Sequence, residues 1–184
     1  MRKKAKAVFL DRDGVINDVV DRGDNCVVGG KKVRFTAPWT YDEFRLKEGV
    51  PEALEEICRC GYLRILVTNQ PDMAYGTMTR DAYDRIMADI KKLPLDDSMV
   101  CLHTRYDGCS CKKPKPGMLI TAAEKWNIDL VSSYIIGDTD EDIGAGTHAG
   151  CRTILIAGRQ NEGIEADYRA TNLREAVTII KQQV

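Results

Sequence analysis

Short apolar runs alternate along the chain with segments of helical periodicity. The apolar runs predict strands at 7–10, 63–67, 98–102, 133–136 and 153–156. The periodic segments predict helices at 51–59, 80–92, 118–126, 140–149 and 173–182. Because strands that alternate with helices form right-handed βαβ units, we predict an α/β fold with a doubly wound, mostly parallel sheet.

One long stretch, from Asp18 to Lys47, has neither period. It holds a glycine pair, a lysine pair and Pro38. Structureless loops of this length in compact domains are usually functional, so we expect a flap with some hairpin character over the strand ends. A chain of 184 residues is the size of one domain, and we expect a single domain over 1–184.

Composition narrows the class of protein. The chain is 43% hydrophobic and 30% charged, with a net charge of −1, which suits a folded core and gives no basic surface for nucleic acid. The first apolar run is too short for a signal segment or a membrane span, so we expect a cytoplasmic protein with no membrane partner. We also expect a monomer with no nucleic-acid partner. An odd cysteine count favours free thiols, and we expect those at 26, 58, 60 and 151 to be mostly buried.

Polar side chains follow three of the predicted strands. The stretch VFLDRDGVIN puts Asp11 and Asp13 on one face of an extended chain, and VTNQ and GDTDED follow two later strands. Ligands of parallel α/β sheets bind beyond the carboxyl ends of the strands, so these clusters are expected to meet. Two adjacent carboxylates repel one another unless a cation or a shared proton lies between them.

These residue types suit phosphoryl transfer. An aspartate can attack phosphorus, a divalent cation offsets the repulsion between the two anions, and a second acid protonates the leaving group. Asp11 and Asp138 offer carboxylates for Mg²⁺, to which a backbone carbonyl near Asp13 adds an oxygen. Asp13 lies on the right face for the acid, while Thr68, Asn69 and a lysine offer donors to phosphate oxygens.

The order of the motifs FLDRDGVIN, VTNQ, CKKPKPGML and IIGDTDEDI resembles that of haloacid-dehalogenase-type (HAD) phosphohydrolases. Within that superfamily, the chain from about 7 to 157 is similar to the heptose bisphosphate phosphatase and histidinol-phosphatase branch. The resemblance implies a Rossmann-like HAD fold with a minimal cap. It further implies that turnover passes through an aspartyl-phosphate and that the substrate is a small phosphorylated metabolite.

The resemblance also implies roles for individual residues. It makes Asp11 the nucleophile and Asp13 the general acid/base. The implied phosphate- and substrate-binding residues are Thr68, Asn69, Gln70, Lys112 and Lys113. The implied Mg²⁺ ligands are Asp11, Asp13 and Asp138, with Asp142 in support. Tyr75 stands where related sequences often carry arginine, and Lys112 where some do.

A second set of ligands lies in the loop over 101–111. Cys101, His103, Cys109 and Cys111 form a C-x-H-x₅-C-x-C pattern, which suits a closed tetrahedral Zn²⁺ site of structural type. The alternative is a group of ordinary loop thiols. The resemblance agrees with zinc, because many members of this branch carry a zinc loop before the lysine motif. By contrast, GAGTHA (144–149) imitates a dinucleotide fingerprint, but it follows four acids and is better read as close helix packing.

The favoured substrate is a heptose bisphosphate that loses one phosphate. Histidinol phosphate or another sugar phosphate is the alternative. A DNA 3′-phosphatase is disfavoured by the near-neutral charge, because a nucleic-acid strand needs a basic groove. A phospho-acceptor signalling domain is a further alternative. It is disfavoured, because such a domain needs neither a zinc loop nor an acid two residues after the nucleophile.

Overall fold

The computed structural model describes residues 4–158 and 161–183. Its core is one sheet in the order β10-β9-β8-β1-β6-β7, and every pairing in it is parallel. The strands are β1 (Lys6–Leu10), β6 (Tyr62–Asn69), β7 (Asp97–Cys101), β8 (Tyr134–Gly137), β9 (Arg152–Ile156) and β10 (Tyr168–Ala170). The doubly wound parallel sheet predicted from the sequence is therefore confirmed.

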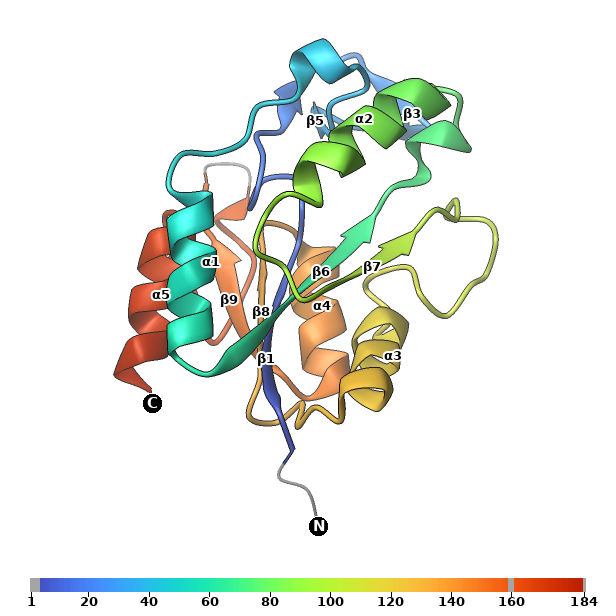
Figure 1. The fold of residues 1–184 in the computed structure, drawn as a ribbon. Helices are drawn as coiled ribbons and strands as arrows, with labels where there is room; N and C mark the ends of the chain where they lie inside the picture. The colour runs from blue at the N-terminus through green and yellow to red at the C-terminus, as the bar shows by residue number, and fades with distance from the viewer. Residues whose placement is uncertain (1–3, 159–160, 184) are drawn as a thin grey trace.

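Helices cover both faces of this sheet (Figure 1). The helices α1 (Val50–Arg59), α2 (Arg80–Ile90) and α5 (Leu173–Gln182) share one apolar cluster. The helices α3 (Gly117–Trp126) and α4 (Asp140–Ala149) belong to the opposite cluster. Successive residues of a strand point to opposite faces, so Val8 and Leu10 join the first cluster while Ala7 and Phe9 join the second.

Local signals end and begin these helices as expected. Pro51 lies in the first turn of α1, where its missing N–H costs nothing, and Gly61 follows the helix with a positive φ of 80°. Thr79 caps α2 by accepting a hydrogen bond from the backbone N–H of Ala82 at 3.2 Å. The helix ends at Ile90, two residues before the predicted end, because a capping turn follows it.

The order of the strands creates a crevice at one edge of the sheet. From the central β1 the chain proceeds to β6 and β7 on one side and then returns to β8 on the other. At such a topological switch point the loops diverge from the carboxyl ends of neighbouring strands. The loops after β1 and β8 therefore open a space between them.

Residues 18–47 lie over this crevice and are called the flap here. They form two short antiparallel hairpins, β2 (Val20–Asp21) with β5 (Phe35–Thr36) and β3 (Val27–Val28) with β4 (Lys31–Lys32), followed by the 3₁₀ turn η1 (Tyr41–Glu43). Figure 1 shows them at the top of the molecule, beyond the ends of the strands. With so few paired backbone groups, the flap depends on its side-chain contacts to the core.

The structure differs from the sequence-based predictions in one strand and in the burial of the scattered cysteines. Strand β10 was not predicted, because it has three residues and only Ala170 in it is buried. The expectation that the scattered cysteines are mostly buried is wrong: of the four, only Cys151 is buried, and Cys58 is exposed at the solvent side of α1. Within the described ranges, no helix combines the length and the apolar character that crossing a membrane requires.

Candidate active site

Three buried carboxylates meet at the switch point. Asp11 follows β1, Asp138 follows β8, and Asp142 lies in the first turn of α4. Carboxylate oxygens of the three lie within 4.8 Å of one another. The backbone N–H of Asp11 donates to the carbonyl of Ile136 at 3.0 Å, which continues the pairing of β1 with β8 and fixes the two acids side by side.

Lys113 supplies the positive charge at this cluster. Its Nζ is buried and donates to Asp11 Oδ1 at 2.8 Å, to the carbonyl of Val67 at 2.9 Å, and to Asp142 Oδ1. Burial alone would lower the pKa of Lys113, but the charges of Asp11 and Asp142 outweigh it and the pKa is raised. The lysine is therefore a fixed cation beside the proposed nucleophile.

One lysine does not balance three buried acids. Burial and the charge of Asp142 raise the pKa of Asp11 to about 7, against the opposing effect of Lys113. Burial and the charge of Asp11 raise the pKa of Asp138 to about 8. Asp138 Oδ1 is enclosed and accepts no hydrogen bond from the described residues. An enclosed carboxylate oxygen among three acids fits a divalent cation with oxygen ligands such as Mg²⁺.

Asp13 lies in the turn after β1, where other residues hold its carboxylate. Arg12 donates to it from Nε and Nη2 at 3.0–3.1 Å, Asn17 Nδ2 at 2.9 Å and Gln70 Nε2 at 2.6 Å. These contacts keep the carboxylate of Asp13 out of the cluster of three acids. As a metal ligand, Asp13 would thus act through its backbone carbonyl. Its carboxylate lines the same cavity as Asp11, as a general acid requires.

Gly14 is required by this turn. It has a positive φ of 84°, and a Cβ on it would stand 2.1 Å from Asp138 Oδ2. The glycine after the two acids therefore allows the loop of β1 to approach the acid of β8. Lys47, at the end of the flap, donates to the carbonyl of Gly14 at 2.6 Å and ties the flap to the same turn.

The predicted phosphate-binding residues separate into two groups. Asn69 and Lys113 line the cavity with Asp11, and Asn69 holds the lysine segment by accepting from the backbone N–H of Lys113 at 3.1 Å. Thr68 is fully buried, and its hydroxyl accepts from Gln70 Nε2 at 3.1 Å. Neither Thr68 nor Gln70 lines the cavity. In this structure Gln70 orients the Asp13 carboxylate.

The catalytic cavity has a volume of about 310 Å³. Its floor consists of the strand-end residues, and its roof is the flap, which contributes Val19, Phe35, Thr36 and Ala37. The flap thus puts mainly apolar side chains opposite the acids.

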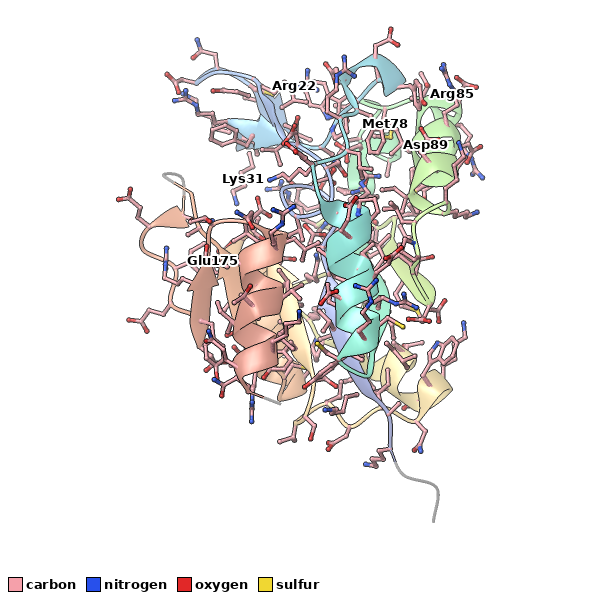
Figure 2. All side chains as sticks on the ribbon, turned by 60° about the vertical axis from the view of Figure 1, so that its left-hand side comes forward. Arg22, Lys31, Met78, Arg85, Asp89 and Glu175 are labelled. Atoms are coloured by element: carbon pink, nitrogen blue, oxygen red, sulfur yellow. The ribbon has the colours of Figure 1, made fainter. Side chains whose placement is uncertain are left out.

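A second cavity of similar volume, about 310 Å³, adjoins the first. Its cationic lining comes from Lys31 of the flap, Arg105 of the loop over 101–111, and Lys112. Tyr75 fixes the arginine by accepting hydrogen bonds from its backbone N–H at 3.0 Å and its Nε at 3.3 Å. Figure 2 shows Lys31 projecting from the flap toward the body of the protein. Lys112 therefore lies in this second cavity, and Lys113 in the first.

The flap is anchored to the core at its far end as well. The hydroxyl of Tyr41 donates to Asp89 of α2 at 2.6 Å, and the guanidinium of Arg85 lies 4.0 Å from the centre of the Tyr41 ring. Figure 2 shows Arg85 and Asp89 together on α2, beside that end of the flap. On the zinc-loop side, Tyr106 donates to the carbonyl of Gly29 at 2.9 Å. The roof of both cavities is thus held at several points.

The structure brings the four predicted zinc ligands together. The Sγ of Cys101 is 3.8 Å from Cys109 Sγ and 3.3 Å from Cys111 Sγ, and His103 Nδ1 is 3.5 Å from Cys101 Sγ. Ligands of a tetrahedral zinc with Zn–S bonds of about 2.3 Å stand about 3.8 Å apart. Burial and the neighbouring thiols raise the pKa of Cys111 to about 12, so without a cation this thiol keeps its proton. The residues present fit Zn²⁺.

The GAGTHA segment is a packing motif, as expected. A Cβ on Gly146 would stand 2.2 Å from Ile135 Cγ2, so glycine lets α4 lie close to β8. His148 is exposed on α4, and its Nδ1 is 3.0 Å from the carbonyl of Pro114. Neither residue lines the catalytic cavity.

Several residues of the site were not found by sequence reasoning. Arg12 is fully buried against Asp13, Arg105 enters the second cavity, and Asp72 and Glu141 line both cavities. Arg12 stood next to the motif acids, but charged residues beside a turn are usually solvated. No local signal marks Arg105 or Asp72, because their partners are distant in sequence.

Fold and site together define a HAD-like hydrolase. The HAD-hydrolase-like family model matches residues 110–176. Curated relatives match over more of the chain. The D-glycero-β-D-manno-heptose-1,7-bisphosphate 7-phosphatase of Pasteurella multocida is 36% identical over 82% of this chain and 81% of its own length. The enzyme of the same name from Salmonella typhi is 31% identical over 100% of this chain and 99% of its own length.

A solved structure of a heptose bisphosphate phosphatase is also similar to this chain. The D,D-heptose 1,7-bisphosphate phosphatase of B. bronchiseptica, complexed with magnesium and phosphate, superposes with a TM-score of 0.78 at 25% identity. The match covers 97% of this chain and 99% of that one. The chain therefore belongs to the HAD-like hydrolase family that includes the heptose 1,7-bisphosphate 7-phosphatases, and its sheet has the HAD-like fold.

Proposed function

We propose that this protein is a Mg²⁺-dependent phosphatase that removes the 7-phosphate of D-glycero-D-manno-heptose 1,7-bisphosphate. The observation that carries the chemistry is the buried Asp11 beside Lys113, next to Asp138, whose Oδ1 accepts no hydrogen bond from the described residues. The names of the relatives carry the substrate. The second cavity agrees, because its three cationic side chains suit the phosphate that does not react.

The first step would be attack by Asp11 on phosphorus. Its Oδ1 is held by Lys113, while Oδ2 accepts no hydrogen bond from the described residues and is the oxygen available to attack. The bond between phosphorus and the leaving oxygen breaks as the new bond to Oδ2 forms. Asp13, which lines the same cavity, would donate the proton that the leaving alcohol needs.

The second step would hydrolyse the phosphorylated Asp11. Asp13, now deprotonated, would take a proton from water, whose oxygen attacks phosphorus and releases phosphate and the free carboxylate. Lys113 and Asn69 line the floor of the cavity, and each would donate to a phosphate oxygen by giving up one acceptor, Asp142 for the lysine and Glu141 for the asparagine. Asp11, Asp138 and the backbone of Asp13 would hold Mg²⁺ with support from Asp142, and the ion offsets the repulsion between phosphate and nucleophile.

The proposal includes a structural Zn²⁺ held by Cys101, His103, Cys109 and Cys111. The loop that this ion would fix begins the segment of Lys112 and Lys113 and carries Arg105. We further propose that the chain acts as a single domain, as a monomer, in the cytoplasm.

A phosphate-release screen with Mg²⁺ tests the proposal. The substrates are the heptose 1,7-bisphosphate, the heptose 1- and 7-monophosphates, histidinol phosphate and a 3′-phosphorylated oligonucleotide. We expect the highest kcat/KM for the bisphosphate, with 7-phosphate as the group released. Histidinol phosphate would bring its ammonium group toward the three cations of the second cavity, so a higher kcat/KM for it would overturn the substrate assignment.

A further inference from the structure

The boundary between the two cavities is formed by flap residues on one side and by polar residues, two of them acids, on the other. Asn69, Asp72 and Glu141 line both cavities, whereas Lys113 lines only the first and Lys31 only the second. A ligand that extends from one cavity to the other thus passes from the acid-rich first cavity, which Lys113 also lines, past Asp72 to the cationic side chains of the second cavity.

Asp72 is the buried acid of this boundary. It lies in the 3₁₀ turn η2 (Pro71–Met73) after β6 and is only 7% exposed. Its Oδ1 accepts hydrogen bonds from Trp39 Nε1 at 3.0 Å and from Thr77 Oγ1 at 3.3 Å. Both donors bond to Oδ1, and by holding this oxygen they set the orientation of the carboxylate.

The other carboxylate oxygen of Asp72, Oδ2, is not engaged by Trp39 or Thr77. Oδ2 accepts no hydrogen bond from the described part of the chain, and it is not among the fully enclosed polar atoms without a partner. It therefore remains accessible from the cavities that Asp72 lines. Burial and the charge of Asp13 raise the pKa of Asp72, because both disfavour the ionised carboxylate.

A carboxylate at this place rejects phosphate and accepts from a hydroxyl. A phosphate group near Asp72 would bring two anions together in a partly desolvated space. A hydroxyl group would give a charge-assisted hydrogen bond to an oxygen that otherwise lacks one. The matching ligand carries its phosphates at its two ends and at least one hydroxyl between them.

We propose that Asp72 is a specificity-determining residue, whose Oδ2 accepts a hydrogen bond from a hydroxyl on the carbon chain between the two phosphates of the substrate. The inference rests on the proposed function, because it takes the reacting phosphate to bind at Asp11. It extends that function by assigning the recognition of the polyol chain to a residue outside the four motifs.

The test compares two bisphosphates that each have seven carbon atoms. One is the heptose 1,7-bisphosphate and the other is heptane-1,7-diol bisphosphate, which lacks hydroxyl groups between its phosphates. The Asp72→Asn variant keeps an oxygen for Trp39 and Thr77 and replaces the free acceptor with an amide donor. We expect the ratio of the two kcat/KM values, heptose over diol, to fall about 10- to 100-fold in this variant, as loss of one hydrogen bond to a charged group predicts.

The Trp39→Phe variant is the matched control. It removes the indole donor to Asp72, while Thr77 still donates to Oδ1 and Oδ2 remains an acceptor, so the ratio should stay near that of the parent. Equal proportional losses on both bisphosphates in Asp72→Asn would overturn the inference, and so would the same fall of the ratio in Trp39→Phe, since Asp72 would then act only through the flap.

The parent protein separates this inference from the proposed function. A parent with equal kcat/KM for the two bisphosphates would overturn the role of Asp72 and leave the phosphatase assignment intact. A parent that releases phosphate from neither would contradict the proposed function and overturn this inference with it. Circular dichroism and a thermal melt of each variant check that the fold is retained.

Discussion

The two ligand clusters of this protein are assembled in opposite ways. The carboxylate cluster collects Asp11, Asp138 and Asp142 from distant parts of the chain and buries all three. The cluster of Cys101, His103, Cys109 and Cys111 lies within eleven residues of one loop, and His103 in it is exposed.

The difference teaches which cluster depends on its metal. The register of β1 with β8 fixes the acids whether or not an ion is bound, because backbone hydrogen bonds hold both strands. The cysteine loop has few backbone bonds of its own, so the free energy of metal binding would supply its order. Changes at the acids should thus impair chemistry first, and changes at the thiols should impair local stability first.

The largest expected effect comes from Asp11→Asn. A neutral amide cannot form the acyl phosphate, so turnover should fall by at least about 10⁴-fold while the far-UV circular dichroism stays that of the parent. The matched control is Asp21→Asn on the exposed part of the flap, whose side chain is 46% exposed. Phosphate release by Asp11→Asn at a rate close to the parent's would contradict the mechanism.

The next effect is that of Asp13→Asn. General acid/base catalysis contributes about 10²- to 10⁴-fold, so kcat for an alkyl phosphate should fall by that amount. The loss should be smaller for p-nitrophenyl phosphate, whose leaving group needs little protonation. If both substrates lose the same factor, Asp13 acts in some way other than protonating the leaving group.

The cysteine loop provides the contrasting case. Cys109→Ser and Cys111→Ser should lose bound zinc, lower the melting temperature and reduce turnover by up to about 10²-fold, because misplacement of Lys113 by about 1 Å has that cost. Their dependence on Mg²⁺ should remain. Elemental analysis and turnover are measured together, with Cys58→Ser as the control thiol, since Cys58 is exposed and far from the loop in sequence. A fully active parent that contains no zinc would show that these are ordinary loop thiols.

The smallest effect concerns pH and Mg²⁺. Burial raises the pKa of Asp11 to about 7 and that of Asp138 to about 8, above the unfolded value of 3.8. Because the pKa values are higher in the folded state, the two protonated acids contribute to the free energy of unfolding of the metal-free protein. This contribution is full below about pH 4 and is lost as the pH rises through about 7 to 8. Magnesium binds the ionised acids.

The increase in melting temperature on adding Mg²⁺ should therefore be larger at about pH 8.5 than at about pH 6, by a few degrees. Thermal melts of the parent and of Asp138→Asn at both pH values measure it. An increase that is larger at the lower pH would contradict the assignment of these acids to the metal.

Local signals in the sequence were sufficient for much of the fold. Alternating apolar runs and helical stripes gave each element of the sheet except β10, whose three residues carry too little pattern. Caps such as Thr79 and stops such as Gly61 acted within a few residues of themselves, which is why they could be recognised. The flap was less predictable, because two-residue strands have no period.

For the active site, too, some features follow from local sequence and others only from the tertiary structure. The sequence by itself determined that Asp11 and Asp13 end a strand, that Gly14 follows them, and that the cysteine loop holds four ligands, since all of these depend on neighbours along the chain. The strand pattern also predicted that Asp138 would approach Asp11, but only the fold decided that their strands are neighbours and that Lys113 Nζ lies between Asp11 and Asp142. The fold also decided that Gln70 turns to Asp13 and that Asp72 lies between two cavities. These contacts join groups whose burial and partners are set by packing, and no spacing along the chain encodes them.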